Sequence, residues 1–228
     1  MMVIQIVSLF PEMFVGPFQS SMIKKAQTHG LVDIRLIALR DFGVGPHKMT
    51  DDYPFGGGIG MLMRSDVVVP AVEWAQVHCH RPATILLTSP QGEIFDQELA
   101  KRLSTLEHVI IVAGHYEGID ERVITLLHPL EISVGDVILT GGELAAMVMV
   151  DAMTRLQPGV LGAENGTLDE SFGTEGGLEA PQYTRPQTYR GLEVPSVLIS
   201  GDHSRIRDWQ QKEALERTRR RRPDLLDP

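Results

Sequence analysis

The sequence predicts an α/β fold with a mostly parallel sheet that is covered by helices on both faces. Short apolar segments rich in β-branched residues alternate with segments of helical character as far as about residue 157, which is typical of parallel sheets. Three of the apolar segments end in loops of small residues, and ligands bind at the carboxyl ends of strands in such sheets. With 228 residues and 43% hydrophobic side chains, the chain is long enough for one such domain and a small appendage.

The first two expected strands flank a helix. Residues 3–10 form an apolar segment that is followed by Pro11, and proline suits the first position of a helix. A helix is expected over residues 12–28, with Gly30 just past its end. The second strand is expected over residues 32–39.

A long segment without regular structure is expected at residues 41–60. It contains Gly43, Gly45 and the run Gly56-Gly-Gly-Ile-Gly60, and a loop of this length inside a compact domain is usually functional or disordered. The run matches neither a P-loop, which needs Gly-Lys-Ser/Thr, nor a dinucleotide-binding fingerprint. By itself it is equally typical of a linker.

The following segments alternate regularly. Helices are expected at about residues 65–77, 96–106 and 120–127, and strands at residues 83–88, 108–113 and 131–139. The small-residue loops at the ends of these strands are Thr88-Ser-Pro-Gln-Gly92, Ala113-Gly-His-Tyr-Glu-Gly118 and the end of Ser133-Val-Gly-Asp-Val-Ile-Leu-Thr-Gly-Gly-Glu143. Because such strand ends meet at one edge of a sheet, the sequence predicts that the three loops form one ligand pocket.

Gly141 and Gly142 are expected to form the floor of this pocket. Glycine adopts backbone angles that are closed to other residues, and it lets a ligand approach the main chain closely. An apolar segment of helical character follows these glycines to about Gln157.

Beyond Gln157 the composition changes. Residues 158–190 are rich in Gly, Pro, Glu and Thr and are typical of a linker. A last helix is expected over residues 205–222, with Ser204 as its N-cap and Pro223 just past its end. Its expected apolar face consists of Ile206, Trp209 and Leu215.

Arginines crowd the end of this helix, where Arg217 and residues 219–222 fill five of six positions. Complementing the helix dipole requires fewer cations, so we expect these arginines to face phosphate groups. The net charge is −9, but residues 201–228 carry eight Arg/Lys and six Asp/Glu, a net of +2, which leaves −11 for the first 200 residues. An acidic body with a basic tail can bind nucleic acid locally.

The remaining composition indicates a cytoplasmic protein. The single cysteine, Cys79, excludes an intrachain disulfide and suits a reducing compartment. His78 and His80 flank it, but no second cluster completes a tetrahedral site, so no metal is expected. No stretch is long and apolar enough to span a membrane, and the first residues lack the basic start of a signal peptide.

Seven stretches, in order along nearly the whole chain, resemble the TrmD family of bacterial tRNA (guanine-N1)-methyltransferases in the SPOUT class. They are Asp51-Asp-Tyr-Pro-Phe-Gly-Gly-Gly-Ile-Gly-Met-Leu-Met63, Ser89-Pro-Gln-Gly92, Gly114-His-Tyr-Glu-Gly-Ile-Asp-Glu-Arg122, Ser133-Val-Gly-Asp136, Thr140-Gly-Gly-Glu-Leu144, Pro158-Gly-Val-Leu161 and Tyr183-Thr-Arg-Pro186. Any one of them would be weak support, whereas seven in sequence are highly specific.

The resemblance implies a cofactor-binding methyltransferase domain at residues 1–160 whose C-terminal part is tied in a trefoil knot. A linker at residues 161–190 and a small helical tRNA-binding domain at residues 191–228 would follow. The resemblance also implies a homodimer with active sites at the subunit interface. S-adenosylmethionine would be the methyl donor, and the guanosine at position 37, beside the tRNA anticodon, would be the acceptor.

The three loops are implied to bind S-adenosylmethionine, with main-chain groups bonding to the adenine and ribose and apolar side chains packing against the ring. The implied cofactor residues are Thr88, Ser89, Pro90, Gly92, Gly114, Tyr116, Glu117, Gly118, Ser133, Val134, Gly135, Val137, Ile138, Leu139, Gly141 and Gly142. This chain departs from the family pattern at Val137, where tyrosine is common, and at Ala145, where the family has proline.

Four charged residues are implied to carry the chemistry. Guanine N1 must lose a proton before it attacks, which requires a base, and the charge that develops on O6 can be stabilised by a guanidinium. Glu170 occupies the position of the family's linker aspartate before Ser-Phe and is the implied base, with Asp169 as the alternative. Arg155 would stabilise O6, and Glu117 would bind the base or hold Arg155.

Two other functions stay open. One is a SPOUT enzyme that methylates a ribose 2′-hydroxyl or another base, against which the stretches at residues 51–63 and 183–186 argue. The other is a non-enzymatic RNA-binding protein that only senses S-adenosylmethionine. The presence of Arg155 together with an acid at Glu170 argues against this second alternative.

Overall fold

The computed structural model describes residues 1–162, 170–173 and 177–226. The chain divides into two compact units, Met1–Gly162 and Ala163–Pro228. In the described ranges, no helix combines the length and the apolar character that crossing a membrane would require.

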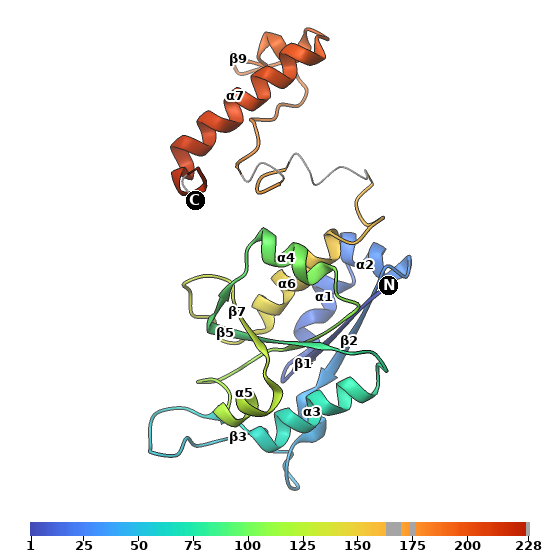
Figure 1. The fold of residues 1–228 in the computed structure, drawn as a ribbon, viewed down its shortest axis with the longest axis vertical. Coiled ribbons are helices and arrows are strands. Elements are labelled where there is room, and N and C mark those ends of the chain that lie inside the picture. The colour runs from blue at the N-terminus through green and yellow to red at the C-terminus, as the bar shows by residue number, and fades with distance from the viewer. Residues whose placement is uncertain (163–169, 174–176, 227–228) are drawn as a thin grey trace. The chain divides into compact units, whose positions relative to one another are not determined.

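The first unit contains a sheet of five parallel strands in the order β2-β1-β6-β5-β7, which confirms the predicted sheet (Figure 1). The strands are β1 (Met2–Ser8), β2 (Val32–Ala38), β5 (Thr84–Ile94), β6 (His108–Val112) and β7 (Leu130–Ser133). Every residue of β1 and β6 is buried. Apart from the buried polar residues Gln5, Ser8 and His108, both strands are apolar and do not alternate with exposed polar residues, as expected when both faces of a sheet are covered.

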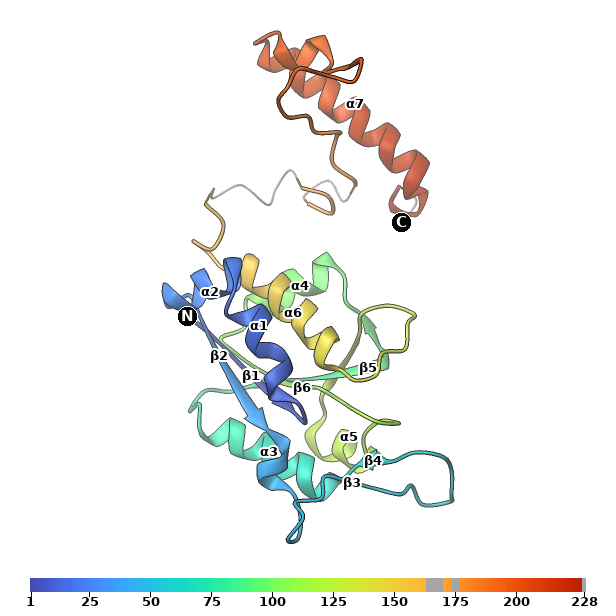
Figure 2. The ribbon, with the colours of Figure 1, turned by 180° about the vertical axis from the view of Figure 1, so that it is seen from behind.

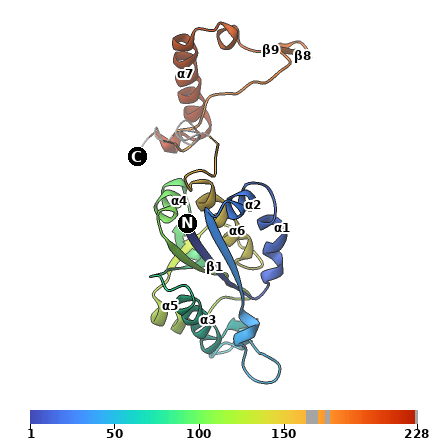
Figure 3. The same ribbon diagram turned by 90° about the vertical axis from the view of Figure 1, so that its right-hand side faces the viewer.

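Helices cover both faces of this sheet, as predicted (Figures 2 and 3). One face is covered by α1 (Val15–Phe18), α2 (Ser21–Thr28), α4 (Gln97–Ser104) and α6 (Glu143–Arg155), and the other by α3 (Ser65–Val77) and α5 (Glu121–Leu127). Successive residues of β6 alternate between the two apolar cores. Val109 and Ile111 belong to the first core, and Ile110 and Val112 belong to the second.

The single helix expected at residues 12–28 is wrong. The segment consists of a 3₁₀ turn η1 (Pro11–Phe14), the short α1 and the separate α2. The break falls at Ser20, which is extended, and Ser21, which has φ 49°. Phe14 and Phe18, which precede the break, are buried in the core. Gly30 lies just past the end of α2 with φ +67°, as predicted.

The strand expected at residues 131–139 is wrong in its second half. Pairing with β5 stops at Ser133, and Gly135 turns the chain away with φ +129°. Val137 and Ile138 are 57% and 84% exposed. Their β-branched side chains therefore do not belong to the sheet.

Residues 41–60 are largely irregular, as predicted. Residues 41 and 42 end η2 (Leu39–Phe42). The two-residue strands β3 (Asp51–Asp52) and β4 (Leu62–Met63) pair antiparallel at the base of the glycine-rich loop. Gly56, Gly57 and Gly58 all have positive φ. Glycine is the residue that adopts this conformation without strain.

The second unit is built around α7 (His203–Arg221), with β8 (Thr188–Tyr189), β9 (Leu192–Glu193), η3 (Ser196–Ile199) and η4 (Pro223–Leu225). The predicted N-cap Ser204 is wrong. Asp202 caps the helix, since its carboxylate accepts from the amides of Ser204 and Arg205, each at 3.1 Å. The predicted apolar face is also wrong at Leu215, which is 42% exposed, whereas Thr218 is buried.

Candidate functional site

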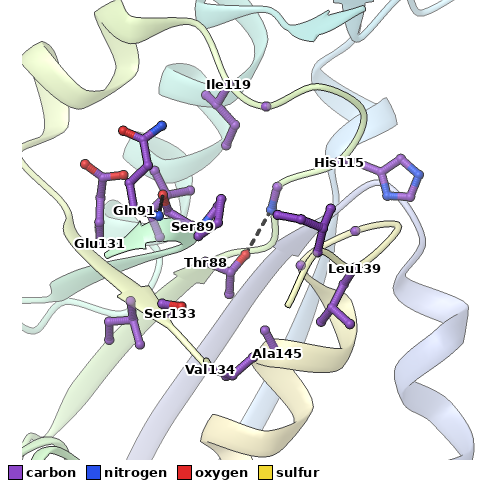
Figure 4. A pocket seen from close by; sticks show the side chains of 18 of the residues that line it. Thr88, Ser89, Gln91, His115, Ile119, Glu131, Ser133, Val134, Leu139 and Ala145 are labelled. Atoms are coloured by element: carbon purple, nitrogen blue, oxygen red, sulfur yellow. Dashed lines mark hydrogen bonds between the residues drawn. The ribbon is translucent and has the colours of Figure 1, made fainter. Parts of the chain in front are cut away.

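A cavity of about 420 Å³ lies in the first unit beside β5, β6 and β7 (Figure 4). Its walls come from a bulge in β5 after Thr88, the loop after β6, the loop after β7 and the start of α6. The prediction that this strand ends at residue 88 is wrong. The strand instead continues to Ile94, and both Thr88 and Glu93 pair with Ile132. The cavity volume falls within the roughly 300–1,000 Å³ of small-molecule pockets.

All the cofactor residues implied by the sequence line this cavity except Gly92. A Cβ on Gly92 would collide with the main chain of Glu131 and Ile132 in β7. This close approach of two strands explains the glycine without a ligand. The lining residues that were not implied are Leu87, Gln91, His115, Ile119, Glu121, Ile124, Glu131, Ile132 and Ala145. Gln91, His115, Ile119 and Glu121 lie in the family-like stretches. Ile124 and Glu131 lie outside them and reach the cavity through the packing of α5 and β7.

The three loops are bonded directly to one another. Gly142 donates its amide to the Gly114 carbonyl at 2.6 Å, and the Gly114 amide donates to the Thr88 hydroxyl at 3.2 Å. The second of these bonds is the dashed line in Figure 4. His115 and Gly141 also form an antiparallel bridge.

The prediction that Gly141 and Gly142 adopt backbone angles closed to other residues is wrong. Gly142 has ordinary helical angles, φ −80° and ψ −3°, and Gly141 is not among the residues with positive φ. What excludes a side chain is space. A Cβ on Gly142 would collide with the Thr88 hydroxyl, and one on Gly141 would collide with His115 and Glu143.

A buried carboxylate supports this junction. Glu143, in the first turn of α6, is 1% exposed, and its Oε1 accepts a hydrogen bond from the Ser8 hydroxyl at 2.9 Å. Its Oε2 lies 3.5 Å from Nδ1 of His115. A carboxylate at a helix N-terminus is stabilised by the helix dipole. Glu143 thus connects the end of β1, the loop after β6 and α6.

Glu117 joins the glycine-rich loop to the cavity. Its amide donates to the Met61 carbonyl at 3.1 Å, and the Met63 amide donates to the Gly118 carbonyl at 2.9 Å. Gly60, with φ +95°, lies under the Glu117 side chain, because a Cβ there would collide with it. Glu117 is therefore held at the cavity by the end of the Gly56–Gly60 run.

Asp120 fixes the far end of the same loop. It caps α5 by accepting from the amide of Arg122 at 2.9 Å, and its own amide donates to the Met63 carbonyl at 3.0 Å. Hydrogen bonding to the Arg122 guanidinium lowers the pKa of Asp120 to about 2.

The residues implied in catalysis lie in different units. Arg155 is the last residue of α6 in the first unit, and Glu170 belongs to the second unit. Asp169 lies outside the described residues. No group of three or more His, Cys, Asp and Glu that could hold a metal ion occurs in the described part of the chain.

Comparison with known proteins decides the family. A model of the family described as tRNA (Guanine-1)-methyltransferase TrmD matches residues 2–228. The chain belongs to this family. It is 52% identical over 225 residues to a protein of Moorella thermoacetica named tRNA (guanine-N(1)-)-methyltransferase, covering 98% of this chain and 89% of the relative. Relatives of the same name from Geobacillus kaustophilus and Dictyoglomus turgidum are 52% and 49% identical, covering 98% and 100% of this chain and 91% of each relative.

In this TrmD family member the arginines at the end of α7 divide into two groups. Arg217 donates to the Glu179 carbonyl at 3.3 Å, and Arg222 forms an ion pair with Asp224 at 2.7 Å. Arg219, Arg220 and Arg221 are exposed. Two of the five predicted phosphate-binding arginines are thus engaged inside the second unit, and three face outward.

Proposed function

We propose that this protein transfers a methyl group from S-adenosylmethionine to N1 of guanosine 37 in tRNA. The observation that carries the proposal is the cavity closed by three mutually bonded loops in a chain of the TrmD family. Its size suits a nucleoside-sized donor. Main-chain groups of the loops supply polar contacts, and Val137, Ile138 and Leu139 supply apolar ones.

The residues of this chain would supply positioning and proton transfer. The bond between the methyl carbon and sulfur breaks in line as the bond to guanine N1 forms, so orientation of the two reactants provides much of the rate. The proton of N1 passes to the carboxylate of Glu170, and the guanidinium of Arg155 stabilises the charge on O6. Glu117, held over Gly60, binds the guanine or orients Arg155.

We further propose that the protein acts as a homodimer. On α6, Leu144 and Val148 are 49% and 52% exposed. They are four residues apart and therefore lie on one face of the helix. Val137 and Ile138, which line the cavity, are exposed as well. We infer that a partner subunit covers these exposed apolar side chains. In this dimer Glu170 of one subunit would serve the cavity of the other.

Three finer features follow from the family and remain proposals. They are a trefoil knot in the C-terminal part of the first unit, a linker at residues 161–190 followed by a tRNA-binding domain at residues 191–228, and a cytoplasmic location, where tRNA is found. The exposed Arg219, Arg220 and Arg221 would contact tRNA phosphates.

Nucleoside analysis by mass spectrometry tests the activity. Unmodified tRNA with guanosine at position 37 is incubated with the protein and methyl-labelled S-adenosylmethionine, in parallel with the same tRNA carrying adenosine there. We expect 1-methylguanosine in the first tRNA and no label in the second. Label on a ribose or on another base would support a different SPOUT activity. Binding of both ligands without transfer would support a sensor.

A further inference from the structure

The segment that carries the proposed base is attached to the arginine-rich end of α7. Within the second unit, the Phe172 amide donates to the Gly177 carbonyl at 2.8 Å, and the Glu179 amide donates to the Ser171 hydroxyl at 3.1 Å. Residues 170–173 and 177–179 thus hold each other. The Gly173 amide in turn donates to the Glu170 carbonyl at 2.9 Å, which closes a turn on the acid itself.

Thr218 connects residues 170–173 and 177–179 to α7. It is the buried polar residue of α7, 1% exposed, and its hydroxyl accepts from the Leu178 amide at 3.0 Å. The same hydroxyl donates to the Ala214 carbonyl at 2.8 Å, so it acts both as a hydrogen-bond acceptor and as a donor. Gly177 leaves the room for this contact, since a Cβ there would lie 3.1 Å from the Thr218 hydroxyl.

Two arginines strengthen the same attachment. Arg217 donates to the Glu179 carbonyl at 3.3 Å, and the guanidinium of Arg222 lies 5.8 Å from the centre of the Phe172 ring. Both flank Arg219, Arg220 and Arg221, which face outward on the last turn of α7. The outward arginines and the Glu170 segment are therefore two sides of one helix end.

From this arrangement we infer that Thr218 is a positioning residue for methyl transfer. It holds the Glu170 segment on the helix end whose arginines bind tRNA phosphates, so that docking of the tRNA backbone places the carboxylate. The inference rests on the proposed function of Glu170. Misplacing a reacting group by a small distance costs rate without costing substrate affinity.

The test compares Thr218→Val with Thr218→Ser in the full-length protein. Valine keeps the shape but removes the hydroxyl, which leaves the Leu178 amide without its acceptor, whereas serine retains the acceptor. We expect Thr218→Val to lower the single-turnover methylation rate roughly five- to tenfold, with tRNA and S-adenosylmethionine affinities unchanged. Thr218→Ser should retain most of the rate. As a control, Thr188 is an exposed threonine in β8, and Thr188→Val should have the rate of the unaltered protein.

A double-mutant cycle with Glu170→Gln separates positioning from general loosening. If Thr218 acts through Glu170, Thr218→Val should slow the Glu170→Gln protein no further. Additive losses, or a full rate in folded Thr218→Val, would overturn the inference. If Thr218→Val does not fold, Ser171→Ala removes the second anchor from the linker side and should show the same rate loss and the same non-additivity. An unaltered protein that makes no 1-methylguanosine would contradict the proposed function instead.

Discussion

Gly142 and Thr88 occupy adjoining space at the floor of the cavity, and a Cβ on Gly142 would collide with the Thr88 hydroxyl and lie 2.8 Å from the Gly114 nitrogen. Overpacking of this kind costs about 1–3 kcal/mol, and here it would separate the loops that form the cofactor site. We expect Gly142→Ala to weaken S-adenosylmethionine binding by about tenfold or more. Calorimetry measures the affinity. Gly162→Ala, where the added carbon meets open space, should leave it unchanged, and equal affinities in the two folded variants would remove this junction from the site.

Asp120 should make α5 and the preceding loop sensitive to acid. Its pKa is lowered from 3.8 to about 2, first by hydrogen bonding to Arg122. The stabilisation is therefore fully present above pH 3.8 and is lost as the pH falls through about 2. Asparagine caps helices as well as aspartate does, so the loss comes from the ion pair with Arg122, and we expect Asp120→Asn to lower the free energy of unfolding by up to about 1 kcal/mol at pH 7. Denaturant titrations of both proteins should show this difference narrowing below pH 3.8, and a constant difference down to pH 2.5 would contradict the assignment.

The choice between Glu170 and Asp169 as the base can be made by isosteric substitution. Loss of a general base costs about 10²- to 10⁴-fold in rate. We expect Glu170→Gln to lose roughly that much in single-turnover rate, with the affinity for S-adenosylmethionine unchanged, and Asp169→Asn to lose far less. The reverse result would assign the base to Asp169. Full rates in both variants would show that neither acid is the base.

Subunit complementation tests the shared site. Gly141→Val should disable the cofactor loops, and Glu170→Ala should disable the acid that the other subunit needs. Mixed dimers then contain one site with intact loops and an intact acid, so activity should return when subunits exchange. Differently tagged subunits allow the mixed dimer to be isolated before the assay. A purified heterodimer without any activity would contradict a site built from two subunits.

The outward arginines of α7 should determine the salt dependence of tRNA binding. Each phosphate contact contributes about 0.7–0.9 to the slope of log affinity against log salt concentration. Replacing Arg219, Arg220 and Arg221 with glutamine should weaken tRNA binding and flatten this slope. Replacing Arg205, Arg207 and Lys212 removes the same charge from the exposed surface of the same helix. An equal effect of both triple variants would show that total charge, rather than the helix end, matters.

Much of the first unit could be predicted from the sequence because its signals are local. Apolar runs such as β1 and β6 and helices such as α3 are determined by neighbouring residues, and the parallel arrangement follows from their alternation. The loops that line the cavity could be predicted as well, since small residues follow each strand at the sheet edge. Family-like stretches added the proposed chemistry.

Tertiary structure decided what depends on residues far apart in the chain. Val137 and Ile138 have the side chains of a strand but lie outside the sheet, because β7 pairs with β5 only as far as Ser133. Gly142 is a glycine because Thr88, fifty-four positions earlier, fills the space of its Cβ, and no local rule contains that contact. Thr218 belongs to a helix by sequence, yet its hydroxyl serves the Leu178 amide forty residues away. Local propensity determines which elements form, whereas collisions and hydrogen bonds between distant segments determine which residues each element can carry.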